Sequence, residues 1–516
     1  MKTAWFVQLN WSRKYDFTEN MILNDLIEGI EVNKLTGSSG LNVSGISIDS
    51  NKVEQGFVFV ALKGENTDGH KYIGPAVENG AAAVIAERTP DIAYEGVTVI
   101  EVPDSRTALA DVSANFYAHP TKELSLVGIT GTNGKTTVTY LLESIWRQQR
   151  LSTGVIGTID CRFGENARES LMTTPESLDL MRTFREMRSS GVQIVAMEVS
   201  SHALDKKRVA GCQFDAAVFT NLTQDHLDYH GTIENYLNAK KTLFTEVLKR
   251  SGKQKKFSII NLDDPYGHDI CRSAPGEVVT YSTHNIKADV YAETSEITEG
   301  GISARVITPR GGLNISSELF GAHNLSNILA AVATAVSLGS KFGNIEKGVS
   351  LARAIPGRLE SVQNTLGLKV LVDYAHTPDA LENVLRAARP LTAGNLILVF
   401  GCGGDRDRTK RPQMGLIGSE LSDILLVTSD NPRTESPEKI IDDIEEGLPG
   451  AGDNTKPCLR ITDRREAIRR AVGMAEQGDT VLIAGKGHED YQIIGKTKYP
   501  FDDRIIAGDA LRERMN

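Results

Sequence analysis

The chain has 516 residues, too many for one hydrophobic core, so its length predicts roughly two to four domains. A formal net charge of -10 at pH 7 excludes a general nucleic-acid-binding protein, because neutralising phosphates needs a basic surface. The five cysteines form no Cys-x-x-Cys pair, and we find no signal peptide and no apolar run of about 18 residues, so we expect a cytoplasmic protein without a zinc site, disulfide framework or membrane span.

The first segment in chain order, residues 1–20, shows no periodicity that connects with the residues after it. We interpret it as a disordered arm or an upstream start-codon artefact, with a real structural role as the alternative. From residue 21 an amphipathic stretch begins, and short β-rich runs ("GFVFVAL", "AAAVIAE" and "VTVIEV") alternate with polar helical stretches. This alternation predicts a small α/β domain over residues 21–122.

Two further domains are expected over residues 123–353 and 354–516. The first of them contains a glycine loop, two apolar runs and a late helical stretch, "NLSNILAAVATAVSL". In the last domain, four apolar runs each end in a loop dense with charge or glycine: "LKVLVDYAH", "NLILVFGCGGDRD", "ILLVTSDNPR" and "DTVLIAGKGHE". Such a pattern is typical of a parallel sheet whose functional groups lie beyond the carboxyl ends of its strands. We therefore expect a three-domain α/β protein with a mostly parallel central sheet and a Rossmann-like C-terminal domain.

The stretch "LSLVGITGTNGKTTVTYLL", residues 124–142, is close to a phosphate-binding loop, although Ile129 stands where the full form has its first glycine. A buried-strand run precedes the loop, and the apolar residues after it share one helical face: Val138, Leu141, Leu142 and Ile145. A strand-to-helix turn of this kind aims backbone N–H groups at an anion. Lys135 can then reach the terminal phosphates, and the Thr136 hydroxyl can reach magnesium. The alternative is a plain glycine turn with a solvated lysine.

Two polar side chains follow apolar runs of the same domain. Glu198 ends the run in "VAMEVSSHAL", and His226 follows the run in "FTNLTQDHLDYHG". We expect both at strand termini, where they could face Mg²⁺ bound to a nucleotide. The alternative for each is an ordinary hydrogen-bonded polar group.

Eleven motifs in this order resemble those of the Mur ligases: "GTNGKTT", "TTPES", "MEVSSHAL", "NLTQDHLDYHG", "NAKKTLF", "GAHNLSNILAA", "PGRLE", "DYAHTPDAL", "GCGGDRDRTKRP", "SDNPR" and "GKGHEDYQ". The resemblance covers the chain from about residue 21 to its end and includes the shortened phosphate loop. It implies an ATP- and Mg²⁺-dependent amide ligase of bacterial peptidoglycan synthesis. Its substrates would be UDP-N-acetylmuramoyl-L-alanyl-D-glutamate and meso-2,6-diaminopimelate, joined through an acyl phosphate.

The resemblance also implies site residues. ATP would be bound by Gly131, Thr132, Asn133, Gly134, Lys135, Thr136, Thr137, Asn324, Asn327, Arg358 and Asp373. The metal ligands would be Thr136, Glu198, His226 and Lys240, the last as a carbamate, and the catalytic residues Lys135, Glu198, His226 and Lys240. The UDP-sugar-peptide would contact Ile48, Ser50, Thr173, Thr174, Ser200 and Arg208. Without the resemblance, Lys240 would be interpreted as an exposed helical lysine. Lys206 stands where the family often has glutamine, which leaves the role of that position open.

For diaminopimelate, the resemblance implies a site made of Arg406, Asp430, Asn431, Pro432, Arg433, Gly485 and Glu489. "GCGGDRD" fails as a dinucleotide fingerprint, since Arg406 replaces the third glycine, and that arginine is better suited to hold a carboxylate. Arg433 offers a planar fork for a second carboxylate, and Glu489 can pair with an ammonium. An ordinary surface ion pair is the alternative for Arg433.

Three alternative functions remain at this point: an L-lysine-adding sister ligase, folylpolyglutamate synthetase, and a nucleotide-binding scaffold without catalysis. Because ATP would lie between domains, catalysis is expected to wait on a hinge near residues 350–357. The expected partners are small-molecule substrates only, with no nucleic acid and no membrane, and the protein is expected to be a monomer.

Overall fold

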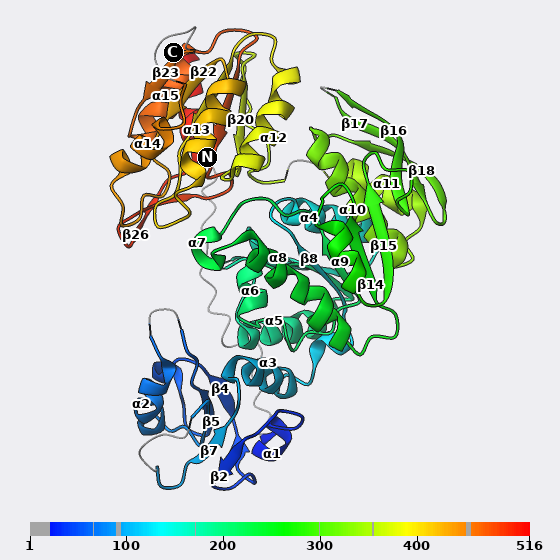
Figure 1. Ribbon diagram of the computed structural model, residues 1–516, viewed down its shortest axis with the longest axis vertical. Helices are drawn as coiled ribbons and strands as arrows, with labels where there is room; N and C mark the ends of the chain where they lie inside the picture. The colour runs from blue at the N-terminus through cyan, green and yellow to red at the C-terminus, as the bar shows by residue number, and fades with distance from the viewer. Residues whose placement is uncertain are drawn as a thin grey trace.

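A computed structural model describes residues 21–64, 67–88, 94–170, 172–298, 300–352, 355–449 and 456–515 of the chain. The predicted N-terminal arm, residues 1–20, lies outside this part. Figure 1 shows three bodies in a row along the long axis, with the blue N-terminal body at one end and the yellow-to-red C-terminal body at the other. Each body is built around its own sheet, of five, eleven and six strands in chain order among the described residues.

The N-terminal body contains the three predicted β-rich runs as neighbouring parallel strands. Its five-stranded sheet has the order β2-β7-β6-β5-β4, and Val58, Val60 and Ile85 pack beneath helix α3. Asp104 caps α3 by accepting from the backbone N–H groups of Arg106 and Thr107. The elements are β1 (Met21–Ile22), α1 (Leu23–Leu26), β2 (Lys34–Thr36), β3 (Asn42–Val43), β4 (Gly45–Ser47), η2 (Ser50–Lys52), β5 (Phe57–Val60), η3 (Gly69–Tyr72), α2 (Ile73–Glu78), β6 (Ala83–Ala86), β7 (Thr98–Glu101), α3 (Ser105–Phe116) and η4 (Pro120–Lys122).

The central body is an eleven-stranded sheet of order β11-β10-β9-β12-β8-β13-β14-β15-β16-β17-β18, parallel from β9 to β16. Helices cover both faces, with α4, α10 and α11 on one and α5, α8 and α9 on the other. Its strands are β8 (Ser125–Thr130), β9 (Thr153–Ile156), β10 (Asp160–Phe163), β11 (Asn166–Glu169), β12 (Ile194–Glu198), β13 (Ala216–Phe219), β14 (Phe257–Asn261), β15 (Glu277–Ser282), β16 (Val290–Thr298), β17 (Gly301–Thr308) and β18 (Gly311–Ser317). Its helices are α4 (Lys135–Gln148), α5 (Ser177–Ser189), α6 (Ser201–Asp205), α7 (Leu227–His230), α8 (Ile233–Thr242), the π-helix η5 (Leu243–Leu248), α9 (Gly267–Ser273), α10 (Ala322–Ser337) and α11 (Phe342–Leu351).

The C-terminal body has a six-stranded sheet of order β19-β20-β24-β21-β22-β23, parallel except at β19. Helices α12, α13 and α14 pack on one face, and α15 and α16 on the other. The elements are β19 (Glu360–Ser361), β20 (Lys369–Asp373), α12 (Pro378–Ala388), η6 (Arg389–Leu391), β21 (Leu396–Phe400), α13 (Lys410–Leu421), β22 (Ile424–Val427), α14 (Pro437–Glu445), β23 (Cys458–Arg460), α15 (Arg464–Met474), β24 (Thr480–Ala484), β25 (Tyr491–Ile494), β26 (Thr497–Pro500) and α16 (Asp503–Met515).

The expected fold class is confirmed: three α/β bodies, the central one mostly parallel and the last one doubly wound. The four apolar runs predicted for the last domain are the parallel strands β20, β21, β22 and β24. The hairpin β25–β26 was not predicted. Among the described helices, none combines the length and the apolar character that a membrane crossing requires.

Candidate active site

The phosphate-loop sequence forms the predicted strand-to-helix turn between β8 and α4. Gly131 has φ +150° and Gly134 has φ +87°, conformations that favour glycine. A Cβ at Gly131 would lie 1.8 Å from the Thr220 hydroxyl oxygen, and one at Gly134 would lie 2.2 Å from the Asn327 amide oxygen. The Lys135 ammonium donates to the carbonyl oxygens of Gly131 at 2.9 Å and Thr132 at 2.8 Å. The ammonium of Lys135 is therefore hydrogen-bonded to two carbonyl groups of its own loop.

Glu198 is the last residue of β12 and is 1% exposed, as expected for a residue at the carboxyl end of a central strand. One carboxylate oxygen accepts from the Thr136 hydroxyl at 2.9 Å and from the Thr158 backbone N–H at 2.9 Å. The other accepts from the Thr158 hydroxyl at 3.0 Å. This carboxylate thus lies beside the first turn of α4, next to the hydroxyl with which it was predicted to share a metal.

The predicted position of His226 at a strand terminus is wrong. Strand β13 ends at Phe219, and His226 follows a loop, in a left-handed conformation (φ 54°) that begins α7. Its Nε2 atom lies 3.3 Å from an Asp225 carboxylate oxygen. Burial lowers the pKa of His226 to about 3, although Asp225 opposes the shift. The imidazole is therefore neutral near pH 7, the form that donates a lone pair to a metal.

Lys240, interpreted without the family as an exposed helical lysine, is 1% exposed on α8. Its Nζ atom donates to the carbonyl oxygen of Gly131 at 2.8 Å and lies 4.3 Å from the ring centroid of Tyr236. Burial and then the charge of Lys135 hold the pKa of Lys240 well below its ordinary value, against the opposing effect of Asp225. The side chain is a weakly basic amine in contact with the phosphate loop.

A pocket of about 110 Å³ lies where the start of α10 meets the C-terminal body. It gathers most of the residues predicted for the nucleotide: Asn133, Gly134, Thr137, Asn324, Asn327, Arg358 and Asp373. Arg358 donates from the C-terminal body to the Thr136 hydroxyl at 3.3 Å, and Asn133 donates to Asp379 at 2.7 Å. Both carboxylate oxygens of Asp373 accept backbone N–H groups, so its contacts support the local chain. The predicted nucleotide residues of two bodies therefore meet in one place.

A larger cavity, about 690 Å³, separates the hairpin β10–β11 from the C-terminal body. Thr173, Arg406, Arg433 and Glu489 line it. A neighbouring cavity of about 170 Å³ shares the last three of these residues and adds His226 and three more of the predicted diaminopimelate residues, Asp430, Asn431 and Gly485. Pro432, the remaining predicted residue, is not among the residues that line it. The predicted amino-acid residues thus face the same space as a predicted metal ligand.

Lys486, which sequence reasoning passed over within "GKGHE", holds two of these side chains. It is 0% exposed, and its ammonium donates to the Asn431 amide oxygen at 3.1 Å and to the Glu489 carboxylate at 3.0 Å. Asn431 also donates to Glu489 at 2.9 Å. Burial opposes ionisation of Asp430, but Lys486 and Arg464 outweigh it and lower the pKa of Asp430. Glu489 was predicted to pair with an ammonium group, and in the structure that ammonium belongs to Lys486.

Arg433 has a left-handed backbone (φ 50°), which an arginine adopts only under constraint. The unpredicted hairpin β25–β26 supplies that constraint: the Arg433 N–H donates to the Ile493 carbonyl at 3.1 Å, and Gly495 donates back to the Arg433 carbonyl at 2.7 Å. The guanidinium donates to the Gly404 carbonyl at 2.7 Å. Burial and the charge of Arg406 lower the pKa of Arg433, so an anion between the two arginines would be favourable.

Asp225 joins the central and C-terminal bodies and was also missed. Its carboxylate oxygens lie 3.7 Å from the Lys410 ammonium and 3.9 Å from the His376 ring. Burial raises the pKa of Asp225, but His226, Lys410 and His376 outweigh that effect, so its pKa falls below the ordinary value. Both partners lie in quoted motifs, "DYAHTPDAL" and "GCGGDRDRTKRP", where only their side-chain chemistry could have drawn attention to them.

Four of the residues predicted for the UDP-sugar-peptide form one group in the central body. The Thr174 hydroxyl donates to the Glu198 carbonyl at 2.9 Å and accepts from the Ser200 N–H at 3.1 Å. Arg208 donates to the Thr174 carbonyl at 3.1 Å and pairs with Glu176. The Thr173 hydroxyl joins the same group, 3.1 Å from that of Thr158.

The other two predicted substrate residues, Ile48 and Ser50, follow β4 in the N-terminal body. Within the described part of the chain, no hydrogen bond or ion pair joins them to the central group. Lys206, the residue that departs from the family, places its ammonium 5.3 Å from the Tyr229 ring centroid.

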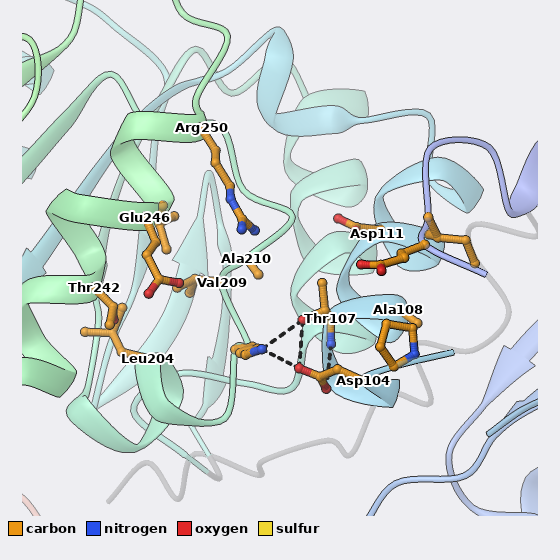
Figure 2. A pocket seen from close by; sticks show the side chains of 15 residues that line it. Asp104, Thr107, Ala108, Asp111, Leu204, Val209, Ala210, Thr242, Glu246 and Arg250 are labelled. Atoms are coloured by element: carbon orange, nitrogen blue, oxygen red, sulfur yellow. Dashed lines mark hydrogen bonds and ion pairs between the residues drawn. The ribbon is translucent and has the colours of Figure 1, made fainter. Parts of the chain in front are cut away.

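A further cavity of about 290 Å³ lies between the N-terminal and central bodies, and none of the predicted site residues lines it. Figure 2 shows Asp104, Thr107 and Asp111 of the α3 segment on one side and Glu246 and Arg250 on the other. Burial raises the pKa of Asp111, and Arg250 offsets only part of that shift. This cavity is separate from the nucleotide and amino-acid cavities.

Comparison with known proteins assigns domain families to all three bodies. Residues 42–117 match "Mur ligase family, catalytic domain", residues 129–335 match "Mur ligase middle domain", and residues 357–487 match "Mur ligase, glutamate ligase domain". A protein of Geobacter metallireducens named UDP-N-acetylmuramoyl-L-alanyl-D-glutamate--2,6-diaminopimelate ligase is 47% identical over 506 residues, covering 96% of this chain and 99% of the relative. A protein of the same name from Geobacillus thermodenitrificans is 46% identical, covering 92% and 96%.

Solved structures agree in fold. One described as a UDP-N-acetylmuramoyl-L-alanyl-D-glutamate--2,6-diaminopimelate ligase is 33% identical, with a TM-score of 0.68 over 96% of this chain and 100% of that chain. The MurF ligase from Thermotoga maritima in complex with ADP is 20% identical, with a TM-score of 0.61 over 91% and 98%, and supports the fold alone. With relatives this similar along nearly its whole length, the chain belongs to the Mur ligase family.

Proposed function

We propose that this protein is an ATP-dependent ligase that joins meso-2,6-diaminopimelate to UDP-N-acetylmuramoyl-L-alanyl-D-glutamate, in the synthesis of bacterial peptidoglycan precursors. The observation that carries the proposal is the cavity beside His226 in which two guanidiniums, Arg406 and Arg433, face one space with Glu489. Diaminopimelate carries two carboxylates and two ammonium groups, and this set of charges complements it. The names of relatives 46% and 47% identical support the same substrate.

The reaction follows from the chemistry of a carboxylate, which is a poor acyl donor near pH 7. The γ-phosphoryl group of ATP is transferred to a carboxylate oxygen of the UDP-linked dipeptide, giving an acyl phosphate and ADP. The amino group of diaminopimelate then attacks the acyl carbon, and inorganic phosphate leaves as the amide forms and a proton is released. The phosphate loop from Gly131 to Thr137, with the charge of Lys135, holds the phosphates in line for transfer.

The donor set beside the loop fits Mg²⁺. Thr136 and Glu198 supply hydroxyl and carboxylate oxygens, the ligands this cation prefers, and the neutral His226 can add a ring nitrogen. When bound, Mg²⁺ would neutralise charge on the phosphate oxygens. Glu198 accepts three hydrogen bonds that fix its carboxylate, so the chain itself orients this group before any ligand arrives.

We propose that Lys240 becomes a carbamate. Its lowered pKa favours the neutral amine, and such an amine can attack carbon dioxide, forming an N–C bond and releasing one proton. The product carries a negative charge and two oxygen donors next to the phosphate loop, where it could hold a second Mg²⁺. The 2.8 Å contact with the Gly131 carbonyl supports a position at the phosphates.

The proposal is tested by incubating the purified protein with ATP, Mg²⁺, the UDP-linked dipeptide and an equimolar mixture of diaminopimelate and L-lysine. We expect phosphate release only when all substrates are present, and a UDP-tripeptide whose mass corresponds to diaminopimelate. A lysine product would favour the sister ligase, activity with folate and glutamate would favour folylpolyglutamate synthetase, and no phosphate release would favour a scaffold. Transfer of ¹⁸O from the dipeptide carboxylate to the released phosphate tests the acyl phosphate.

We also propose that the enzyme works as a cytoplasmic monomer. Every group in the proposed reaction comes from one chain, and the five cysteines are unpaired, as expected in a reducing compartment. Size-exclusion chromatography with light scattering tests the oligomeric state.

A further inference from the structure

The first turn of helix α3 reaches from the N-terminal body to the central body. Asp104, its N-cap, pairs with Lys207, and Arg106 points toward Glu176. Lys207 and Arg208 are adjacent in sequence, and Arg208 pairs with the same Glu176. Lys207 of the central body therefore pairs directly with the start of α3, and Glu176 lies between Arg208 of its own body and Arg106 of α3.

Arg106 has a buried donor that is not satisfied. Its Nη2 atom donates to the Lys63 carbonyl at 3.1 Å, whereas Nη1 is buried without a hydrogen-bond partner and lies 3.9 Å from a Glu176 oxygen. The other oxygen of Glu176 accepts from Nε of Arg208. One carboxylate is thus shared by two guanidiniums, which leaves a net positive charge and an unused N–H donor.

The position of this pair of arginines matches a ligand that spans two bodies. Lys63 follows β5, so Arg106 lies at the carboxyl ends of the parallel strands of the N-terminal sheet, where ligands of α/β sheets bind. Arg208 donates to the Thr174 carbonyl, within the group predicted for the sugar-peptide. A tetrahedral or planar oxyanion between the two guanidiniums would satisfy donors that a single carboxylate now shares.

We propose that Arg106 joins Arg208, already predicted to contact the UDP-sugar-peptide, in an oxyanion site for that substrate, and that Glu176 occupies this site as an internal substitute while no substrate is bound. The inference rests on the proposed function, which supplies a substrate with both a diphosphate and peptide carboxylates. Either group offers the required oxyanion. Binding would move the Glu176 carboxylate away and close the N-terminal body onto the central one through Arg106.

Calorimetric titration of the full-length protein with the UDP-linked dipeptide, without ATP, tests the proposal. Arg106→Ala should weaken binding at least about tenfold, and Arg106→Lys should lose less, because a lysine keeps the charge and loses the fork. Glu176→Gln should tighten binding, since it removes the competing charge. Arg182→Ala is the matched control: its side chain is 51% exposed and pairs with Asp179 on α5, so binding should not change.

Several outcomes would overturn the inference. Unchanged binding by Arg106→Ala removes the oxyanion role, and weaker binding by Glu176→Gln shows that Glu176 is a structural support for Arg208. If thermal melting shows that Arg106→Ala is unfolded, Arg106→Lys is used for the same test. Titration with UDP alone identifies the anion: a loss shared by UDP indicates the diphosphate, and a loss confined to the dipeptide compound indicates a carboxylate. A wild-type protein that binds neither compound would contradict the proposed function itself.

Discussion

Replacing Lys486 with methionine should lower both the stability of the protein and its affinity for diaminopimelate, because it removes a buried positive charge from the amino-acid site. The ammonium is fully buried and holds Asn431 and Glu489 at 3.1 Å and 3.0 Å. Its loss leaves the Glu489 carboxylate without its ammonium partner and removes one of the two cations that compensate Asp430, the other being Arg464. Removing one partner of a buried pair costs about 3–5 kcal/mol. We expect the free energy of unfolding, measured in urea by circular dichroism, to fall by about this amount.

The same variant should raise the KM for diaminopimelate at least about tenfold, or about 1.4 kcal/mol, while the KM for ATP changes little. Combining it with Glu489→Gln should cost less stability than the sum of the two single changes, because the second change removes the unpaired charge. Lys498→Met, on the exposed hairpin 3.8 Å from the Tyr491 ring centroid, is the control. Full stability and an unchanged KM for diaminopimelate in Lys486→Met would refute the reasoning.

Three further predictions follow from the site. Arg433→Ala should raise the KM for diaminopimelate far more than the KM for ATP, because the lost charge-assisted contact costs about 2–5 kcal/mol of binding free energy. Equal effects on both KM values in steady-state assays would contradict its role. Lys135→Ala should abolish phosphate release and leave the circular dichroism spectrum unchanged, so residual turnover near wild type would argue against the loop. Because the pKa of His226 is lowered to about 3 in the fold, its neutral form stabilises the protein above about pH 6.5, and this stability is lost as pH falls toward 3. His226→Asn should therefore make urea unfolding less dependent on pH in that range, and an unaltered dependence would count against the shift.

Local patterns in the sequence predicted the elements whose cause is local. The face formed by Val138, Leu141, Leu142 and Ile145 is 0% exposed on α4, because a helical period alone decides which residues share a face. The four apolar runs of the last domain became parallel strands for a similar reason, since a strand covered on both faces needs a continuous apolar run.

Local patterns in the sequence could not predict contacts between residues that are distant in the chain. Lys240 is buried against the Gly131 carbonyl, which lies 109 positions earlier in the chain. The pattern of residues along a helix cannot predict such a contact. His226 was expected at the end of β13, but the strand stops at Phe219 and a loop carries the imidazole into place. The support of Arg433 by the hairpin and the sharing of Glu176 by two arginines arise only once separate segments or bodies meet.

The sheet of the central body has one more consequence, for the size of what the protein can accept. Strand β8, which leads into the phosphate loop, and strand β11, at the edge of the 690 Å³ cavity, are separated by β12, β9 and β10 in one hydrogen-bonded ladder. Neighbouring strands lie about 4.8 Å apart, so roughly 19 Å of rigid backbone separates the two strands. A molecule that contacts both strands must therefore span at least that distance.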